Sequence, residues 1–286
     1  MSSIFFVRLL NLSTANDFML EGQKLMSPET IYATPKVVTD LKDCFFYHTM
    51  DLPEYGLVKG HWDLRETVDE YLGNIDFDGK RVLDVGTANG FLGFHAECMG
   101  AEVVAFDCSV DYRLDIIPFA ENDEEQELLK YKAMIGKVNN AYWLAHRVYG
   151  SEAKFVYGTV YEIPEAIGSV DIAIVGAILE HLRDPFLALQ NTLRLTKETV
   201  IVVERLFACT SKEEALEQLQ VPPSMLFLPA LLEKSHNLSW WYLPPIIIQE
   251  FIKVLGFETS QLTVHSQWSN IEGEVWFYTL VAQRIH

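Results

Sequence analysis

The segment RVLDVGTANGFLGFHAECMGAEVVAFDCS, residues 81–109, constrains the fold of this chain more than any other. Residues 81–85 are an apolar, β-branched run, which is typical of a buried parallel strand. Gly86 and Gly90 permit a sharp turn and a close approach of the backbone to a ligand, and the residues after them open a helix whose free N–H groups face that ligand. Residues 103–106 predict the next strand, which ends at Asp107.

Asp107 follows the glycine loop by about twenty residues, where a carboxylate in a βαβ unit can accept hydrogen bonds from both hydroxyls of a ribose. A dinucleotide site needs G-x-G-x-x-G, yet Ala88 stands at the middle glycine and Asp84 lies inside the turn. A carboxylate there would repel a pyrophosphate, which speaks against a Rossmann dehydrogenase. It suits a nucleotide cofactor that carries a positive charge. The alternative is an ordinary βα turn with a chance acid.

The D-x-G-x-x-x-G loop followed by Asp107 resembles motifs I and II of the class I S-adenosylmethionine (SAM) methyltransferases. The resemblance implies SAM as cofactor and S-adenosylhomocysteine as product. It also implies that the cofactor contacts come from this loop and from the end of the next strand: Asp84, Gly86, Thr87, Asn89, Gly90, Asp107 and Cys108.

Two later segments extend this resemblance. FVYGTVYEI, residues 155–163, ends a strand where these methyltransferases present a polar side chain and a backbone amide to adenine, which here would be Thr159 and Val160, although the family more often has Asp or Asn at the first position. GAILEHLRDP, residues 176–185, is similar to the motif IV region, which would place Gly176 at the cofactor and the Glu180–His181 pair beside the transferable methyl group.

His181 is the first candidate for a general base, because its reference pKa lies near neutrality. A base is needed only if the acceptor must lose a proton, and Glu180 is the substitute candidate. The alternative is that His181 packs on or caps the turn that Asp184 and Pro185 make.

HWDLR, the glycine loop, GAILEHLRDP and a W-Y-L-P-P run before a helix ending L-G-F together resemble the methyltransferases related to the tRNA carboxymethoxyuridine-forming enzymes. This likeness implies that Trp62 and Arg65 lie near the cofactor, and it makes His61 a further base candidate beside His48. The tRNA enzymes carry G-C-G-N-G in the loop and a more basic insertion. This chain has G-T-A-N-G and an acidic, aromatic insertion, which favours a small, flat, apolar metabolite as acceptor.

The rest of the chain alternates strands and helices. Strands are predicted at 154–157, 170–175 and 199–203, helices at 63–72, 121–149 and 245–256, and a final hairpin at 258–264 and 275–282. We therefore predict an α/β fold: a Rossmann-like, seven-stranded class I methyltransferase sheet with helices on both faces, plus an N-terminal arm and an inserted cap.

We expect residues 1–62 to form the arm and an aromatic flap, and residues 63–286 to form the methyltransferase domain, with the cap at about 206–243. The flap either covers the site or only packs on the core. The cap, which contains Trp240, Trp241 and Tyr242, either roofs the acceptor pocket or serves as a structural lobe or dimer face.

The formal net charge of −18 over 286 residues disfavours a nucleic-acid partner, because phosphate backbones are engaged by clustered Lys and Arg. Four cysteines without C-x-x-C spacing indicate reduced thiols in a cytoplasmic protein, and no metal ligands are assigned. The IFFVRLL run is broken by Arg8 and makes a poor signal peptide, and no later segment is long and apolar enough to span a bilayer.

These features favour a SAM-dependent methyltransferase that acts on N, O or C of a small specialised metabolite. A tRNA-modifying transferase and a noncatalytic SAM-binding module remain as alternatives. The sequence does not determine the oligomeric state or the acceptor.

Overall fold

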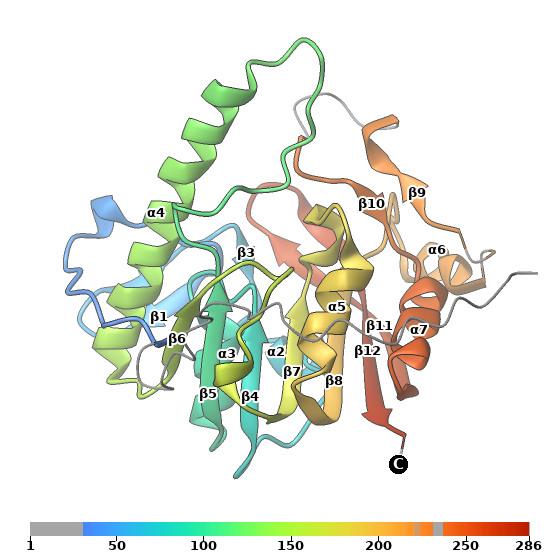
Figure 1. The fold of residues 1–286 in the computed structure, drawn as a ribbon, viewed down its shortest axis with the longest axis horizontal. Helices are drawn as coiled ribbons and strands as arrows, with labels where there is room; N and C mark the ends of the chain where they lie inside the picture. Colours follow the sequence, from blue (N-terminus) through green and yellow to red (C-terminus); the bar gives the residue numbers. More distant parts are fainter. Residues whose placement is uncertain (1–30, 221, 223, 231–236, 286) are drawn as a thin grey trace, which may run out of the picture.

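The computed structural model describes residues 31–220, 222, 224–230 and 237–285, so the first thirty residues of the predicted arm lie outside the described part. Its centre is one mixed sheet with the strand order β3-β11-β12-β8-β7-β4-β5-β6 (Figure 1). The bounds of these strands are β3 Trp62–Asp63, β4 Arg81–Val85, β5 Glu102–Asp107, β6 Lys154–Tyr157, β7 Val170–Gly176, β8 Thr196–Arg205, β11 Phe257–Ser269 and β12 Gly273–Arg284.

The five strands from β4 to β8 pair in parallel, whereas β12 runs antiparallel to β8 and forms a hairpin with β11. The parallel strands are continuous apolar runs in the sequence, because both faces of such strands are covered by helices. The predicted α/β class with a parallel sheet and a final hairpin is confirmed. The sheet has an eighth strand that the sequence did not predict, since β3 adds to the outer edge of β11.

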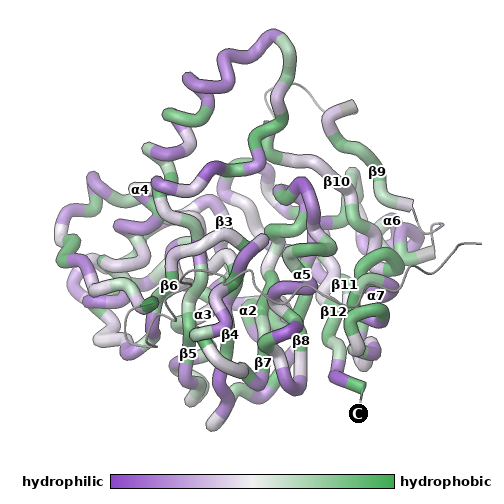
Figure 2. Tube along the Cα trace, in the orientation of Figure 1, coloured by the Kyte–Doolittle hydropathy of each residue, from purple (hydrophilic) through white to green (hydrophobic). Residues whose placement is uncertain are grey.

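Helices cover both faces of the sheet. Helices α2 (Val68–Tyr71), α3 (Phe91–Cys98) and α4 (Glu124–Tyr149) contribute to one apolar core, and α5 (Pro185–Leu193) and α7 (Pro245–Val254) contribute to the other. Figure 2 shows hydrophobic colour through the central strands and hydrophilic colour on the first turns of α4, which project beyond the sheet. None of the described helices combines the length and the apolar character needed to cross a membrane.

The helix predicted at residues 63–72 is wrong in its first half. Trp62 and Asp63 pair with Ser269 and Trp268 on the edge of β11, so this backbone is extended. A turn follows, in which the Thr67 N–H donates to the Leu64 carbonyl at 3.1 Å, and only then does α2 begin. Pairing with the sheet edge therefore overrides the local helical pattern.

The arm packs directly on the core. Its described part contains a small hairpin, β1 (Met50–Leu52) and β2 (Gly56–Val58), and the Phe45 N–H donates to the carbonyl of Lys137 on α4 at 3.0 Å. The cap contains α6 (Lys212–Glu217) and a second small hairpin, β9 (Leu226–Phe227) with β10 (Trp241–Tyr242). Short 3-10 turns complete the fold at Leu41–Asp43, Glu165–Ile167, Leu179–His181, Gln218–Gln220 and Leu228–Ala230.

The path of the chain marks where a ligand can enter. From β4 the chain runs outward to β5 and β6, then returns to β7 on the other side of β4 and continues to β8. The strand order therefore reverses between β4 and β7. In open α/β sheets, ligands bind in the crevice outside the carboxyl ends of the strands at such a switch point.

Candidate cofactor and acceptor site

The turn after β4 is shaped by two glycines in the left-handed region. Gly86 has φ +77°, and a Cβ there would lie 2.6 Å from the side chain of Ile178. Gly90 has φ +87°, and a Cβ there would lie 2.3 Å from the ring of Phe94. No larger residue fits either position without moving its neighbours, so the loop keeps its backbone close to the cavity described below.

Asp84 supports this loop from inside. Its carboxyl group is buried and accepts hydrogen bonds from the Thr87 hydroxyl at 2.6 Å and from the Gly93 N–H. Burial raises the pKa of Asp84 to about 6, against the lowering effect of the Thr87 bond. Asp84 and Thr87 do not line the cavity, so they act on a ligand only through the loop backbone.

Asp107 stands at the end of β5 with its carboxylate fixed by two backbone amides. One oxygen accepts from the Ala88 N–H and the other from the Cys108 N–H, both at 2.7 Å. A carboxylate oxygen has more than one acceptor site, so each retains capacity for a ligand hydroxyl. Burial raises the pKa of Asp107 and of the neighbouring Cys108 thiol, while the two amides oppose this for Asp107.

A cavity of about 300 Å³ opens in front of Asp107, and we call it the main cavity. Most of its surface is apolar, and its walls come from the ends of β4, β5, β6 and β7, from α4 and from the loop between β5 and α4. Seven predicted site residues line it: Gly86, Asp107, Cys108, Thr159, Val160, Gly176 and His181.

Several walls of the main cavity were not predicted as site residues. Tyr112, Leu114 and Asp115 come from the loop before α4, and Met134 and Val138 come from α4 itself. The helical spacing of Met134 and Val138 indicates a buried face, but only the crossing of α4 over the strand ends turns that face toward the cavity.

A small side cavity of about 40 Å³ adjoins the main cavity, because both are lined by Tyr47, His48, Gly176 and Ala177. Its other walls are Trp62, Leu64, Tyr71, Glu180, Arg205 and Phe277. Ala177, at the junction, has φ +52°, a backbone conformation that is uncommon for a residue with a Cβ. Trp62 and Glu180 thus belong to the side cavity, whereas Gly176 belongs to both.

Besides Asp84 and Thr87, three more residues predicted as cofactor contacts line neither cavity. Asn89 is fully buried and is bonded to the backbone of His48, and Gly90 caps α3. Arg65 lines neither cavity, because its guanidinium is bonded to Asp51 at 2.7 Å and to Asp63 at 2.8 Å on the surface.

His181 is held from both sides. Its Nδ1 lies 3.2 Å from the Leu238 carbonyl and its Nε2 lies 3.3 Å from Glu180 Oε1. Donation from Nδ1 to this carbonyl leaves the Nε2 side of the ring facing Glu180. The role of His181 as a general base stays a prediction.

Glu204, which was not predicted, fixes the turn that carries this pair. It is buried at the end of β8 and its Oε1 accepts from the Leu179 N–H at 2.8 Å, with further backbone bonds from residues 178 and 180. Burial raises the pKa of Glu204 well above its ordinary value. A charge at the end of the TVIVV run was the available signal for this residue.

The two flap histidines differ in position. His48 is 7% exposed and lines both cavities, and its Nδ1 has no hydrogen-bond partner among the described residues. Burial lowers the pKa of His48 to about 4. His61 stacks on Trp62 with ring centroids 5.3 Å apart and lies outside both cavities. Of the two, His48 is the one that a ligand can reach.

The strand order, the antiparallel β12 and the glycine turn facing Asp107 together decide the fold. The fold is that of the class I methyltransferases. Among solved structures with this fold, a SAM-dependent methyltransferase from Methanosarcina mazei is 15% identical, with a TM-score of 0.48 over 78% of this chain and 99% of its own.

Two further solved structures are similar at the same level. Magnesium protoporphyrin IX methyltransferase from Synechocystis, with bound S-adenosylhomocysteine, is 15% identical, with a TM-score of 0.47 over 77% of this chain and 81% of its own. The 1,6-didemethyltoxoflavin-N1-methyltransferase of Burkholderia thailandensis is 13% identical, with a TM-score of 0.47 over 77% of this chain and 78% of its own. At these values the likeness says nothing about what this chain binds.

No family model matches the sequence, and no curated protein matches it. The assignment of ligand and reaction therefore depends on the geometry of this methyltransferase fold alone.

The roof of the main cavity is tied together by Asp115. Its carboxylate accepts from the Tyr161 hydroxyl and from the Arg183 N–H, the latter at 2.7 Å, and its carbonyl accepts from the Trp240 indole at 2.6 Å. Asp115 thus joins the loop before α4, the turn after β7 and the cap. All three segments meet above the carboxyl ends of the strands, as in Figure 1.

The aromatic cap residues do not line the main cavity; of the described cap, Leu238 does. Trp241 packs on Phe227 within the cap hairpin, and its indole donates to the Arg183 carbonyl at 3.2 Å. The Tyr242 hydroxyl donates to the Gln218 side chain at 2.6 Å. The Trp241 indole thus ties the cap to the turn after β7, and Tyr242 is bonded within the cap. The contact of these rings with the acceptor stays a prediction.

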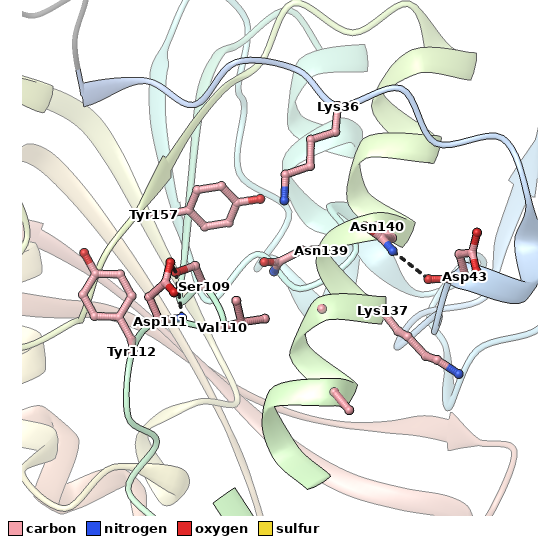
Figure 3. A pocket seen from close by; sticks show the side chains of 12 residues that line it. Lys36, Asp43, Ser109, Val110, Asp111, Tyr112, Lys137, Asn139, Asn140 and Tyr157 are labelled. Carbon is pink, nitrogen blue, oxygen red and sulfur yellow. Dashed lines mark hydrogen bonds between the residues drawn. The ribbon is translucent and has the colours of Figure 1, made fainter. Parts of the chain in front are cut away.

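An open, more polar groove of about 670 Å³ lies on the far side of Asn139, between α4 and the arm (Figure 3). Figure 3 shows Lys36 above the ring of Tyr157 and the bond from Asn140 to the Asp43 carbonyl, which measures 2.9 Å. The Asn139 amide donates to the Cys108 carbonyl at 3.4 Å. The Asn140 bond attaches the arm to α4, and the Asn139 bond fixes the loop beside Asp107. Contacts along this groove therefore stabilise the site.

Proposed function

We propose that this protein is a SAM-dependent methyltransferase with a small-molecule acceptor. The observation that carries the proposal is the Asp107 carboxylate, held by two loop amides and facing an apolar cavity at the switch point of the sheet. A ribose needs paired acceptors, an adenine needs apolar walls, and both are present within one cavity.

Each part of the cofactor has residues that would contact it. Asp107 would hold the ribose hydroxyls, and Thr159 and Val160, on the same cavity wall, would face the adenine. Gly86 and Gly176 leave the strand ends bare, which would let the sulfonium end approach the side cavity. When bound, SAM would supply an electrophilic methyl group. Its positively charged sulfur is the leaving group and becomes neutral on transfer.

The chain itself would contribute alignment and exclusion of water. The loop that contains Tyr112 and Asp115, the Leu238 segment of the cap, and α4 enclose the acceptor over the cofactor. Holding two reactants in line can account for several kcal/mol of barrier reduction, on the order of 7–11 at best. Glu204 and His181 would act through Glu180 by fixing its position.

A small acceptor is favoured over tRNA by the size of the enclosed cavity and by the net charge of −18. The test is to incubate the protein with SAM that carries a labelled methyl group and two fractions of a cell extract, its small molecules and its tRNA. We expect label in the small-molecule fraction. Label in the tRNA would favour the tRNA-modifying alternative, and SAM binding without any transfer would favour a noncatalytic module.

A further inference from the structure

The walls of the side cavity are mostly aromatic. Trp62 and Phe277 meet edge to face with centroids 5.3 Å apart, Tyr71 lies 6.1 Å from Phe277, and the Trp62 indole is hydrogen bonded to Tyr47. Trp62, Tyr71 and Phe277 are each less than 9% exposed. The faces of such rings attract a cation, most strongly where water is excluded.

The charge balance of the side cavity also favours a cation. Glu180 contributes a carboxylate to its wall. Arg205 lines it too, but its guanidinium makes two bonds to Glu272, at 2.5 and 3.1 Å. The positive charge of Arg205 is thereby directed to its partner carboxylate. Glu180 keeps its carboxylate on the wall, with Oε1 3.3 Å from Nε2 of the His181 ring.

His48, which lines both cavities, has a ring nitrogen without a hydrogen-bond partner in the part of the chain that the structure describes. His48 is only 7% exposed, and its Nδ1 has no hydrogen-bond partner among the described residues. Because burial lowers the pKa of His48 to about 4, the imidazole is neutral at pH 7 and can accept a hydrogen bond from an N–H group. Because His48 lines both cavities, its ring lies where the cofactor and the substrate amine would meet.

The volume limits the group that fits. About 10–15 Å³ is the least volume that holds one water molecule, so a cavity of about 40 Å³ admits only a group of a few heavy atoms. An amino group with one or two carbon substituents has that size. The apolar body of a larger acceptor would remain in the main cavity.

We propose that the side cavity formed by Tyr47, His48, Trp62, Tyr71, Phe277 and Glu180 holds the amino group of the acceptor, and that the enzyme is an amine N-methyltransferase. This deepens the proposed function and rests on it. The amine enters as the free base with one N–H donated to His48. Its lone pair forms the new N–C bond while the C–S bond of the cofactor breaks, and those electrons stay on sulfur.

The step balances in charge, because the positive charge lost by the sulfonium appears on the methylated nitrogen. No oxidant and no separate base are required for the transfer itself. Glu180 and the ring faces would stabilise the nitrogen more as its charge develops, which is the condition for lowering the barrier.

The test uses dimethylammonium as a probe of three heavy atoms, titrated into the protein loaded with S-adenosylhomocysteine. The Trp62 indole signal, assigned by its loss in Trp62→Phe, should shift saturably, whereas ethanol, a neutral molecule with the same number of heavy atoms, should not shift it. In Glu180→Gln the affinity should fall about tenfold. The matched control Glu274→Gln removes the same charge from an exposed site and should change nothing.

Three results would overturn the proposal. The first is the absence of a saturable Trp62 shift in the wild type, and the second is an equal response to dimethylammonium and ethanol. The third is competition between dimethylammonium and S-adenosylhomocysteine, which would mean that the rings hold the cofactor's own ammonium group. Failure of the proposed function is distinguishable, because it would appear as absence of S-adenosylhomocysteine binding while dimethylammonium still shifts Trp62.

Discussion

Asn89 is bonded to both backbone polar groups of His48: its Oδ1 accepts from the His48 N–H at 2.8 Å and its Nδ2 donates to the His48 carbonyl at 3.2 Å. One side chain of the glycine loop thus satisfies a residue more than forty positions earlier in the chain. This pair couples the loop that faces the main cavity to the flap wall shared by both cavities. A residue of the cofactor motif therefore serves to position the flap.

Replacing Asn89 with Ala should destabilise the protein by about 2–4 kcal/mol, because a buried N–H and a buried carbonyl of His48 both lose their partner. Urea unfolding measures the change. Asn140→Ala is the matched control, since its bond to the Asp43 carbonyl is exposed and should cost less than about 1 kcal/mol. Equal effects of the two substitutions would contradict the role of Asn89 in positioning the flap.

The stability of the protein should fall in mild acid because of His265. This ring is 2% exposed, accepts at Nδ1 from Gln267 and donates from Nε2 to Thr279, each at 2.8 Å. Burial lowers the pKa of His265 from 6.5 to about 4. Between these values the unfolded chain holds the extra proton, so the contribution is complete above pH 6.5 and is lost toward pH 4, up to about 3 kcal/mol.

The comparison of wild type with His265→Gln isolates this effect, because buried Asp84, whose pKa is raised to about 6, changes stability in the opposite direction over part of the same range. The variant should lose less stability than the wild type between pH 6.5 and 4. Parallel pH profiles for the two proteins, or a His265 ring that titrates near pH 6.5 by NMR, would refute the assignment.

Asp115→Ala should loosen the roof while leaving the sheet intact. The substitution removes the acceptor for the Tyr161 hydroxyl and for the Arg183 N–H, so these two segments lose their common anchor. We expect faster amide exchange in residues 112–117 and 237–242 than in β4 or β7, and SAM affinity reduced severalfold, in keeping with about 1–2 kcal/mol. Unchanged exchange in both segments would show that the cap does not depend on Asp115.

Much of the sheet could be predicted. The middle of β8, residues 199–203, is a continuous β-branched run, which is typical of a strand covered on both faces. The segment at residues 63–72 could not be predicted, since its fate depends on pairing between Trp62 and Ser269, more than two hundred residues later. Local pattern contains no information about that edge.

The same limit applies to the site. Asp107 was predictable because a strand end fixes which way its carboxylate faces. Asp84 and Asn89 belong to the same motif, but their side chains turn inward to Thr87 and His48, and spacing alone does not give that direction. Tyr47 and Met134 reach the main cavity only through the packing of the flap and α4 on the strand ends.

The central claim is that Asp107 holds the ribose of a SAM cofactor, and calorimetry of SAM and S-adenosylhomocysteine with Asp107→Ala tests it most directly. Each charge-assisted bond is worth about 1.5–3 kcal/mol, so the affinity should fall at least tenfold. Glu258→Gln, an exposed acid on β11, should bind like the wild type. Tight binding in both the wild type and Asp107→Ala, with equal affinity, would contradict the account, as would a wild type that binds neither compound.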